Sequence, residues 1–266
     1  DRNQSVSLFE GLTEKYAGTN VKFIYAQGCD LTSNNTSGFA EAVATARRAD
    51  LVIAAMGEDF NWSGEAACRT NIQLPGVQQD LLKELKKTGK PVGLILVNGR
   101  PLDLSWEDEN VDAILEAWYL GTMAGHGMAD VSSGGYNPSA RLTMSFPRNV
   151  GQLPIYYNHK STGRPLPADA PNTDYKSSYL DSPNTPLYPF GYGLSYTAFG
   201  VSNVKLDTNK LDKGGKITVT ADVTNTGYIK GETVVQLYIR DLVGSVTRPV
   251  KELKGFHKLA LEPGEK

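Results

Sequence analysis

Residues 77–97 read VQQDLLKELKKTGKPVGLILV, and this stretch decides the expected fold. Four apolar side chains share one face of a predicted helix: Val77, Leu81, Leu82 and Leu85. Gly89 stands where such a helix commonly ends. The following run, 91–97, is rich in apolar and β-branched residues, which is typical of a strand. The pattern therefore predicts a helix that is followed by a buried strand.

The same alternation of strand and helix patterns runs through the first half of the chain. Strands are predicted over 21–25, 51–56, 91–97 and 111–118, and helices over 39–46, 77–87 and 121–131. Strands that alternate with helices in this way form a largely parallel sheet with helices on its faces. We therefore expect an α/β fold, a largely parallel α/β sandwich, over residues 1–147.

The composition changes after this region. Residues 147–196 hold eight of the 14 prolines and much of the tyrosine. Proline disfavours both helices and central strands, whereas the aromatic side chains are costly to leave in water. We predict that residues 148–198 form an extended, ordered connection that wraps around other parts of the molecule.

The last part of the chain follows a period of two residues. Apolar residues alternate with polar ones in two runs: Ile217, Val219, Ala221 and Val223, then Val235, Leu237 and Ile239. Turn residues, 225–227, separate the runs. The pattern predicts a β-sandwich over 199–266, but with about four or five strands in place of the roughly seven of an immunoglobulin-like sandwich. We therefore expect this domain to be truncated.

The bulk properties exclude several classes of partner. With 27 basic and 29 acidic residues the formal net charge is −2, which gives no reason to expect nucleic acid or an anionic membrane as a partner. No apolar run approaches the roughly 20 residues that cross a bilayer. The two cysteines form neither a disulfide framework nor a zinc pattern, and no phosphate-binding glycine motif occurs. We predict no metal and no cofactor, and a nucleotide-binding α/β protein is disfavoured.

The loop 57–69, GEDFNWSGEAACR, is a candidate active site. It follows a predicted strand, and ligands of parallel sheets meet the loops at the carboxyl ends of the strands. A carboxylic acid that acts as a general acid must remain protonated near neutral pH. The aromatic residues Phe60 and Trp62 can desolvate the Glu65 carboxyl, and the carboxylates of Glu58 and Asp59 can repel its ionised form. Arg69 has the opposite effect, because its positive charge favours the ionised carboxylate. The residue types alone leave a solvated loop as the alternative.

Two further features are weaker candidates. His159, beside Arg164, is a candidate for a substrate-lining position, with an ordered loop contact as the alternative. The aromatic segment 188–196 can stack on sugar rings, but packing between domains is the favoured interpretation.

Six stretches together resemble a known family. They are SGEAACRTNIQLPGVQQDLL (63–82), TGKPVGLILVNGRPLDL (88–104), DAILEAWYLGT (112–122), the run from ADV to GRP (129–165), YPFGYGLSYTAF (188–199) and the run from VTNTG to KGF (223–256). In this order they resemble the C-terminal half of a glycoside hydrolase family 3 β-glucosidase, especially the bacterial periplasmic type. The resemblance covers nearly all of the chain.

The resemblance implies a three-part architecture: an N-terminal (β/α)8 barrel, an α/β sandwich and a fibronectin type III-like domain. On this reading the chain lacks the barrel, begins after the first strand of the α/β domain and ends within the last domain. We therefore expect a fragment of an exported protein, periplasmic or secreted, whose partner is the barrel of the same full-length chain.

The resemblance also implies a reaction. The family hydrolyses terminal non-reducing β-D-glucosyl residues of β-glucosides or gluco-oligosaccharides with retention, using a nucleophilic aspartate of the barrel and an acid/base glutamate. Glu65 matches the acid/base, and Glu58 is the competing assignment. Trp62, Arg69 and His159 are the expected substrate neighbours. The fragment alone should be inactive, and the alternative function is a non-catalytic carbohydrate-binding or interaction module.

Overall fold

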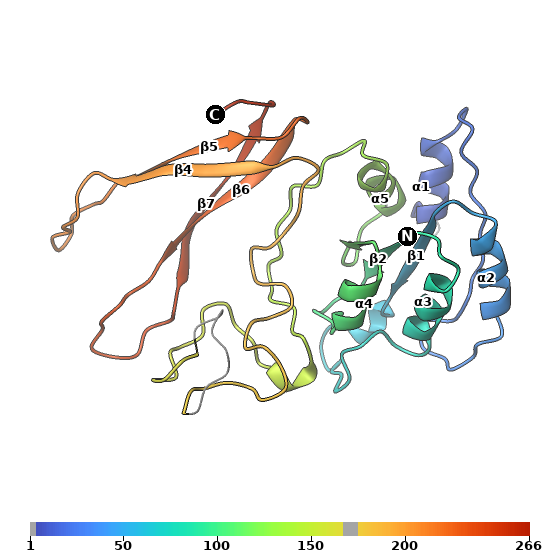
Figure 1. The fold of residues 1–266 in the computed structure, drawn as a ribbon, viewed down its shortest axis with the longest axis horizontal. Helices are drawn as coiled ribbons and strands as arrows, with labels where there is room; N and C mark the ends of the chain where they lie inside the picture. The colour runs from blue at the N-terminus through green and yellow to red at the C-terminus, as the bar shows by residue number, and fades with distance from the viewer. Residues whose placement is uncertain (1–3, 167–174) are drawn as a thin grey trace.

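A computed structural model describes residues 4–166 and 175–266 of the chain. Residues 1–3, and residues 167–174 of the predicted connection, lie outside the described residues. Figure 1 shows the helices gathered around β1 and β2 in one part of the molecule and the long strands β4 to β7 in another. The chain between these two parts runs mostly as coil.

The first part is built on a parallel sheet. Its central strand, β2 (Val92–Val97), lies between β1 (Val52–Gly57) and β3 (Ala113–Glu116). Both pairings are parallel. The predicted parallel sheet is therefore confirmed, and β2 is apolar throughout because helices cover both of its faces.

The helices divide between the two faces of this sheet. Leu94 and Leu96 of β2 pack in one core cluster with α2 (Phe39–Arg47) and α3 (Gln78–Lys86). Ile95 points the other way and packs with Met128 in a second cluster. This second face carries α1 (Leu8–Lys15) and α5 (Ala124–Ser132), which contact each other. The alternation of side chains along one strand thus builds both cores.

One predicted strand is wrong. Residues 21–25 are described without strand structure, because no neighbouring strand pairs with them among the described residues. A groove of about 1320 Å³ is lined by residues 20–28 on one side and by 51–56 on the other. The apolar, β-branched pattern carries no information about the hydrogen-bonding partner that a strand needs.

Two helices were not predicted. The first, α1, begins with a capping box in which the Ser7 hydroxyl accepts a hydrogen bond from the Glu10 backbone N–H, and the Glu10 carboxylate accepts one from the Ser7 N–H. This Ser-x-x-Glu signal is present in the sequence. The second helix, α4 (Ser105–Asn110), is a short turn between β2 and β3.

The second part consists of two antiparallel pairs. β4 (Phe199–Leu206) pairs with β5 (Val219–Asn225), and β6 (Gly231–Ile239) pairs with β7 (Glu252–Leu261). The buried side chain of Asn225 ties the pairs together, because its Nδ2 donates to the Leu261 carbonyl at 3.0 Å. These strands confirm the predicted fibronectin type III-like character of this region.

The aromatic residues of the connection pack against each other. The rings of Tyr157 and Phe190 stack with centroids 4.3 Å apart, and those of Tyr188 and Tyr192 stack at 5.3 Å. The Tyr188 hydroxyl also donates to Asp108 of α4 at 2.5 Å. These contacts favour the packing interpretation of segment 188–196 over sugar stacking.

The central strand gives a first prediction. Leu96 is fully buried, and truncation to alanine leaves a cavity between the sheet and α3. Leu96→Ala should lower the free energy of unfolding by roughly 2 to 5 kcal/mol. Urea unfolding followed by tryptophan fluorescence measures this, because all three tryptophans lie before residue 119. As a control, Leu242→Ala removes a side chain that is 78% exposed and should change stability by less than about 0.5 kcal/mol; equal effects of both changes would contradict the described core.

Candidate active site

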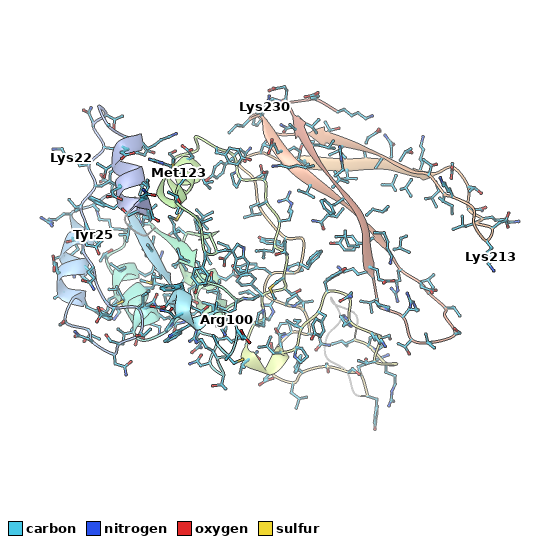
Figure 2. The ribbon with its side chains drawn as sticks, turned by 180° about the vertical axis from the view of Figure 1, so that it is seen from behind. Lys22, Tyr25, Arg100, Met123, Lys213 and Lys230 are labelled. Carbon is cyan, nitrogen blue, oxygen red and sulfur yellow. The ribbon has the colours of Figure 1, made fainter. Side chains whose placement is uncertain are left out.

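Polar side chains collect at the carboxyl edge of the parallel sheet. Glu58 directly follows β1, Asn98 and Arg100 follow β2, and Glu116 is the last residue of β3. Because the strands are parallel, these ends lie side by side. Arg100 projects from the α/β part of the chain, where Figure 2 labels it. The loop 57–69 thus begins at the edge where the sequence predicted it.

The buried carboxylate of Glu58 is the centre of this cluster. Its side chain has no exposed surface, and Oε1 accepts from Arg69 Nη1 at 2.6 Å. Nε of Arg100 lies 3.2 Å from the same oxygen. Both arginines are partly buried with this carboxylate, so two guanidinium groups compensate the cost of its burial. Glu58 therefore has a structural role at the base of the loop.

Arg100 also binds the backbone of the loop. Its Nη2 donates to the carbonyl of Trp62 and, at 3.3 Å, to the carbonyl of Ala67. A second tether lies at the start of the loop, where the Tyr119 hydroxyl donates to the Asp59 carbonyl at 2.9 Å. Between these tethers the loop forms a short 3-10 helix, η2 (Phe60–Trp62).

Glu65 lies at the tip of the loop. The backbone N–H of Ala67 donates to the Gly64 carbonyl at 3.3 Å, which closes a turn with Glu65 and Ala66 at its centre. The Glu65 side chain is exposed, and no hydrogen bond or ion pair joins it to another residue of the described chain. Phe60, which the sequence suggested as a cover for Glu65, is itself 52% exposed.

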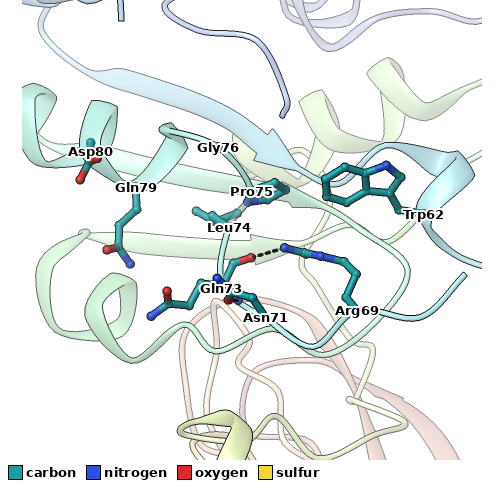
Figure 3. Close-up of a pocket in the computed structure, with 9 residues that line it drawn as sticks. All are labelled: Trp62, Arg69, Asn71, Gln73, Leu74, Pro75, Gly76, Gln79 and Asp80. Atoms are coloured by element: carbon teal, nitrogen blue, oxygen red, sulfur yellow. Dashed lines mark hydrogen bonds between the residues drawn. The ribbon is translucent and has the colours of Figure 1, made fainter. Parts of the chain in front are cut away.

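Trp62 and Arg69 do lie together. The Arg69 guanidinium carbon is 5.0 Å from the centroid of the Trp62 ring, within the range of a cation–π contact. Both residues line a pocket of about 380 Å³ next to the loop (Figure 3). The other lining residues are Asn71, Gln73, Leu74, Pro75, Gly76, Gln79 and Asp80. An indole beside amide and guanidinium groups offers an apolar surface together with hydrogen-bonding groups.

His159 lies elsewhere in the described chain. It is exposed in the connection, where its carbonyl accepts from the Val250 N–H at 2.9 Å and its Nδ1 is 3.1 Å from the Lys160 carbonyl. These contacts join the connection to the strand region and not to the loop 57–69. Its substrate-lining role stays a prediction.

Glu116 is a site residue that the sequence did not indicate. Burial raises the pKa of its carboxyl to about 8, and the charge of Glu58 adds to this effect. Hydrogen bonds from the Trp118 N–H and from Asn98 act in the opposite direction. Oε2 of Glu116 and Oδ1 of Asn98 are both buried without a hydrogen-bond partner among the described residues. A proton on the Glu116 carboxyl removes the cost of burying a second charge at this edge.

Comparisons with known proteins agree with this architecture. Residues 2–196 match the glycosyl hydrolase family 3 C-terminal domain, and residues 233–266 match the fibronectin type III-like domain. A periplasmic β-glucosidase of Salmonella typhimurium is 46% identical over 99% of this chain, and a β-xylosidase of Formosa agariphila is 45% identical over 98%. The chain spans 37% and 35% of the lengths of these two relatives.

Solved structures show the same likeness. The β-glucosidase of Listeria innocua in complex with gluconolactone superposes with a TM-score of 0.93 at 40% identity, over 100% of this chain and 36% of the other. A β-glucosidase of Erythrobacter marinus superposes with a TM-score of 0.86 at 37% identity, over 98% of this chain and 37% of the other. Within the described ranges, no helix combines the length and apolar character that a membrane span requires.

Glu116 gives a pH-dependent prediction. The pKa of Glu116 in the folded protein is raised to about 8. The contribution of its protonated carboxyl to the free energy of unfolding is therefore complete below the ordinary carboxyl pKa, declines as the pH rises and is lost above about pH 8. Glu116→Gln should therefore change stability little at pH 5 and should raise it at pH 8.5, by roughly 4 kcal/mol. Urea unfolding at both pH values measures the difference. Glu109→Gln, an exposed change on α4, is the control and should keep the wild-type decline; no gain at pH 8.5 in Glu116→Gln would contradict the buried protonated carboxyl.

Proposed function

The chain belongs to the glycosyl hydrolase family 3 C-terminal domain family, and on this basis we propose that it is the part of a retaining β-glucosidase that carries the acid/base carboxylate. The observation that supports this most is the place of Glu65. It stands at the tip of a tethered loop, at the carboxyl edge of the sheet, with a carboxylate free of partners in the described chain. The relatives named β-glucosidase support the reaction class.

Glu65 fits the acid/base role better than Glu58 does. A general acid must reach the glycosidic oxygen and must exchange its proton during the cycle. Glu58 is enclosed and bound by Arg69 and Arg100, so its carboxylate is not open to a substrate. Glu65 is exposed and can meet a substrate that is held by another part of the protein.

In the proposed mechanism Glu65 acts twice. Its carboxylic acid first gives a proton to the oxygen of the leaving group while a nucleophilic carboxylate attacks the anomeric carbon. Its carboxylate then removes a proton from the water that hydrolyses the glycosyl intermediate. Retention requires the two carboxyl groups to lie about 5 to 5.5 Å apart. We propose that the nucleophile comes from an N-terminal barrel of the full-length chain, whose walls also desolvate Glu65.

The pocket beside the loop is the proposed contact for the leaving group. The Trp62 ring and the Arg69 guanidinium line it together, next to the segment that carries Glu65. His159 is not part of this contact, because its described hydrogen bonds lie in the connection.

The substrate sugar is proposed to be glucose, and the protein is proposed to be exported to the periplasm. The relative named periplasmic β-glucosidase, at 46% identity, supports both. The relative named β-xylosidase, at 45% identity, makes a β-xyloside the second candidate. The ratio of kcat/KM for p-nitrophenyl β-glucoside and p-nitrophenyl β-xyloside, measured on the full-length protein, separates the two.

The acid/base role predicts a dependence on the leaving group. In the full-length protein, Glu65→Gln should lower kcat by on the order of 100-fold to 10,000-fold for an alkyl β-glucoside, which needs acid assistance. For 2,4-dinitrophenyl β-glucoside the loss in the first step should be far smaller, because this leaving group needs no proton. Pre-steady-state bursts measure that step. Glu109→Gln is the control, and an equal loss for both substrates would argue against Glu65.

If this chain supplies only one of the two catalytic carboxylates, a half-site, the isolated chain should be inactive. Purified residues 1–266 should show no hydrolysis of p-nitrophenyl β-glucoside above the buffer rate, because one carboxylate cannot complete the retaining cycle. Isothermal titration with gluco-oligosaccharides tests the alternative, a carbohydrate-binding module. Saturable binding without activity would favour the module, whereas turnover near that of a complete enzyme would overturn the half-site.

A further inference from the structure

One guanidinium group holds the loop on both sides of Glu65. The Nη2 atom of Arg100 binds the carbonyl of Trp62, three residues before Glu65, and the carbonyl of Ala67, two residues after it. Residues 62–67 are thereby closed into a small ring of chain. These bonds restrain the movement of Glu65 relative to the sheet.

The backbone inside the ring is held in an uncommon conformation. Gly64 has a φ of 130° and Ala66 a φ of 59°, so both neighbours of Glu65 lie in the region that side chains disfavour. Such a conformation at a residue other than glycine persists only when the surroundings impose it. Two contacts of the described chain hold this turn: the bond from the Ala67 N–H to the Gly64 carbonyl inside it, and the bonds from Arg100 to both of its ends.

The ring also packs tightly on the end of β2. A Cβ atom added to Gly99 would lie 2.1 Å from Ser63 Oγ and 2.6 Å from Tyr119 Cε2. No side chain therefore fits at position 99 unless the ring moves. Gly99 and Arg100 are neighbours, so one short segment after β2 both contacts the ring and binds it.

Glu58 completes the arrangement by fixing Arg100 itself. Its carboxylate lies 3.2 Å from Arg100 Nε, while Nη2 of the same guanidinium binds the loop. A planar guanidinium can serve the carboxylate and two carbonyls at once, whereas an ammonium group cannot match this fork geometry.

We propose that Arg100 is a positioning residue for Glu65, which it holds at a fixed height above the carboxyl edge of the sheet. This inference rests on the proposed acid/base role of Glu65. Proton transfer is sensitive to small displacements, and a misplacement of about 1 Å can cost about 100-fold in rate. Arg100 touches neither the substrate nor the reacting atoms.

The test uses two variants of the full-length protein. Arg100→Lys keeps the positive charge beside Glu58 but loses the fork that binds both carbonyls. Gly99→Ala keeps every charged group, and its added methyl group pushes the segment 62–67 away from the end of β2. This variant remains informative if Arg100→Lys folds poorly. The matched controls are Arg47→Lys on the exposed side of α2 and Gly93→Ala on β2, where an added Cβ meets no atom within 4 Å.

Both variants should reproduce the pattern of Glu65→Gln in weaker form. The value of kcat for an alkyl β-glucoside should fall by about 10-fold to 100-fold, with little change in KM. The first step on 2,4-dinitrophenyl β-glucoside should change less than about threefold, because it needs no proton from Glu65. Both controls should match the wild type. A merely structural role would lower both substrates equally, and that result, or no loss at all, would overturn the inference.

Glu65→Gln measured in parallel separates the two levels of the proposal. If it shows the dependence on the leaving group and neither Arg100→Lys nor Gly99→Ala does, the positioning role fails alone. If it shows no dependence, the acid/base role fails and the positioning role fails with it. In the double variant Arg100→Lys with Glu65→Gln, the first change should cause no further loss on the alkyl glucoside, since the group that it positions is gone.

Discussion

The candidate site depends on the buried carboxylate of Glu58 between Arg69 and Arg100. An isolated charge at this depth would be strongly unfavourable, and two guanidinium groups compensate it. The ion pairs also have a geometric effect. Glu58 stands at the start of the loop, just after β1, and Arg69 stands at its end. Arg100 comes from the turn after β2. The ion pairs of Glu58 therefore connect both ends of the loop to the neighbouring strand. The loop is thereby built into the sheet edge at its base while its tip stays free.

Three glutamates near this edge have different roles because their surroundings differ. Glu58 is enclosed and paired with two cations. Burial raises the pKa of Glu116 to about 8, and no described residue forms an ion pair with its carboxyl. Glu65 is exposed and unpaired in the described chain. Of the three, Glu65 is the one whose side chain is open to solvent, as the proposed acid/base role requires. Residue type alone could not distinguish these roles, since all three are the same amino acid within 59 residues of chain.

The parts of the fold that the sequence predicted are those with local signals. The apolar periodicity of 77–97 predicted α3 and β2. The capping box formed by Ser7 and Glu10 is a local signal of the same kind for α1. The prediction of a strand over 21–25 was wrong, because apolar periodicity indicates burial and strand propensity but does not show whether another strand is available to pair. Among the site residues, Trp62 and Arg69 lie together, and their role beside a substrate stays a prediction. Arg100 was missed because its partners are backbone carbonyls 33 and 38 residues earlier in the chain, and such contacts leave no pattern in a sequence.

The proposed division of the site between two parts of the full-length protein is compatible with relatives that are named for different sugars. A β-glucosidase and a β-xylosidase match this chain almost equally well, at 46% and 45% identity. In the proposed mechanism Glu65 acts on the oxygen of the leaving group, and this step is the same for both sugars. Glucose and xylose differ at C5, on the ring that the nucleophile attacks, so discrimination must come from groups around that ring. A chain that supplies the acid/base and the leaving-group contact can therefore serve either sugar without change.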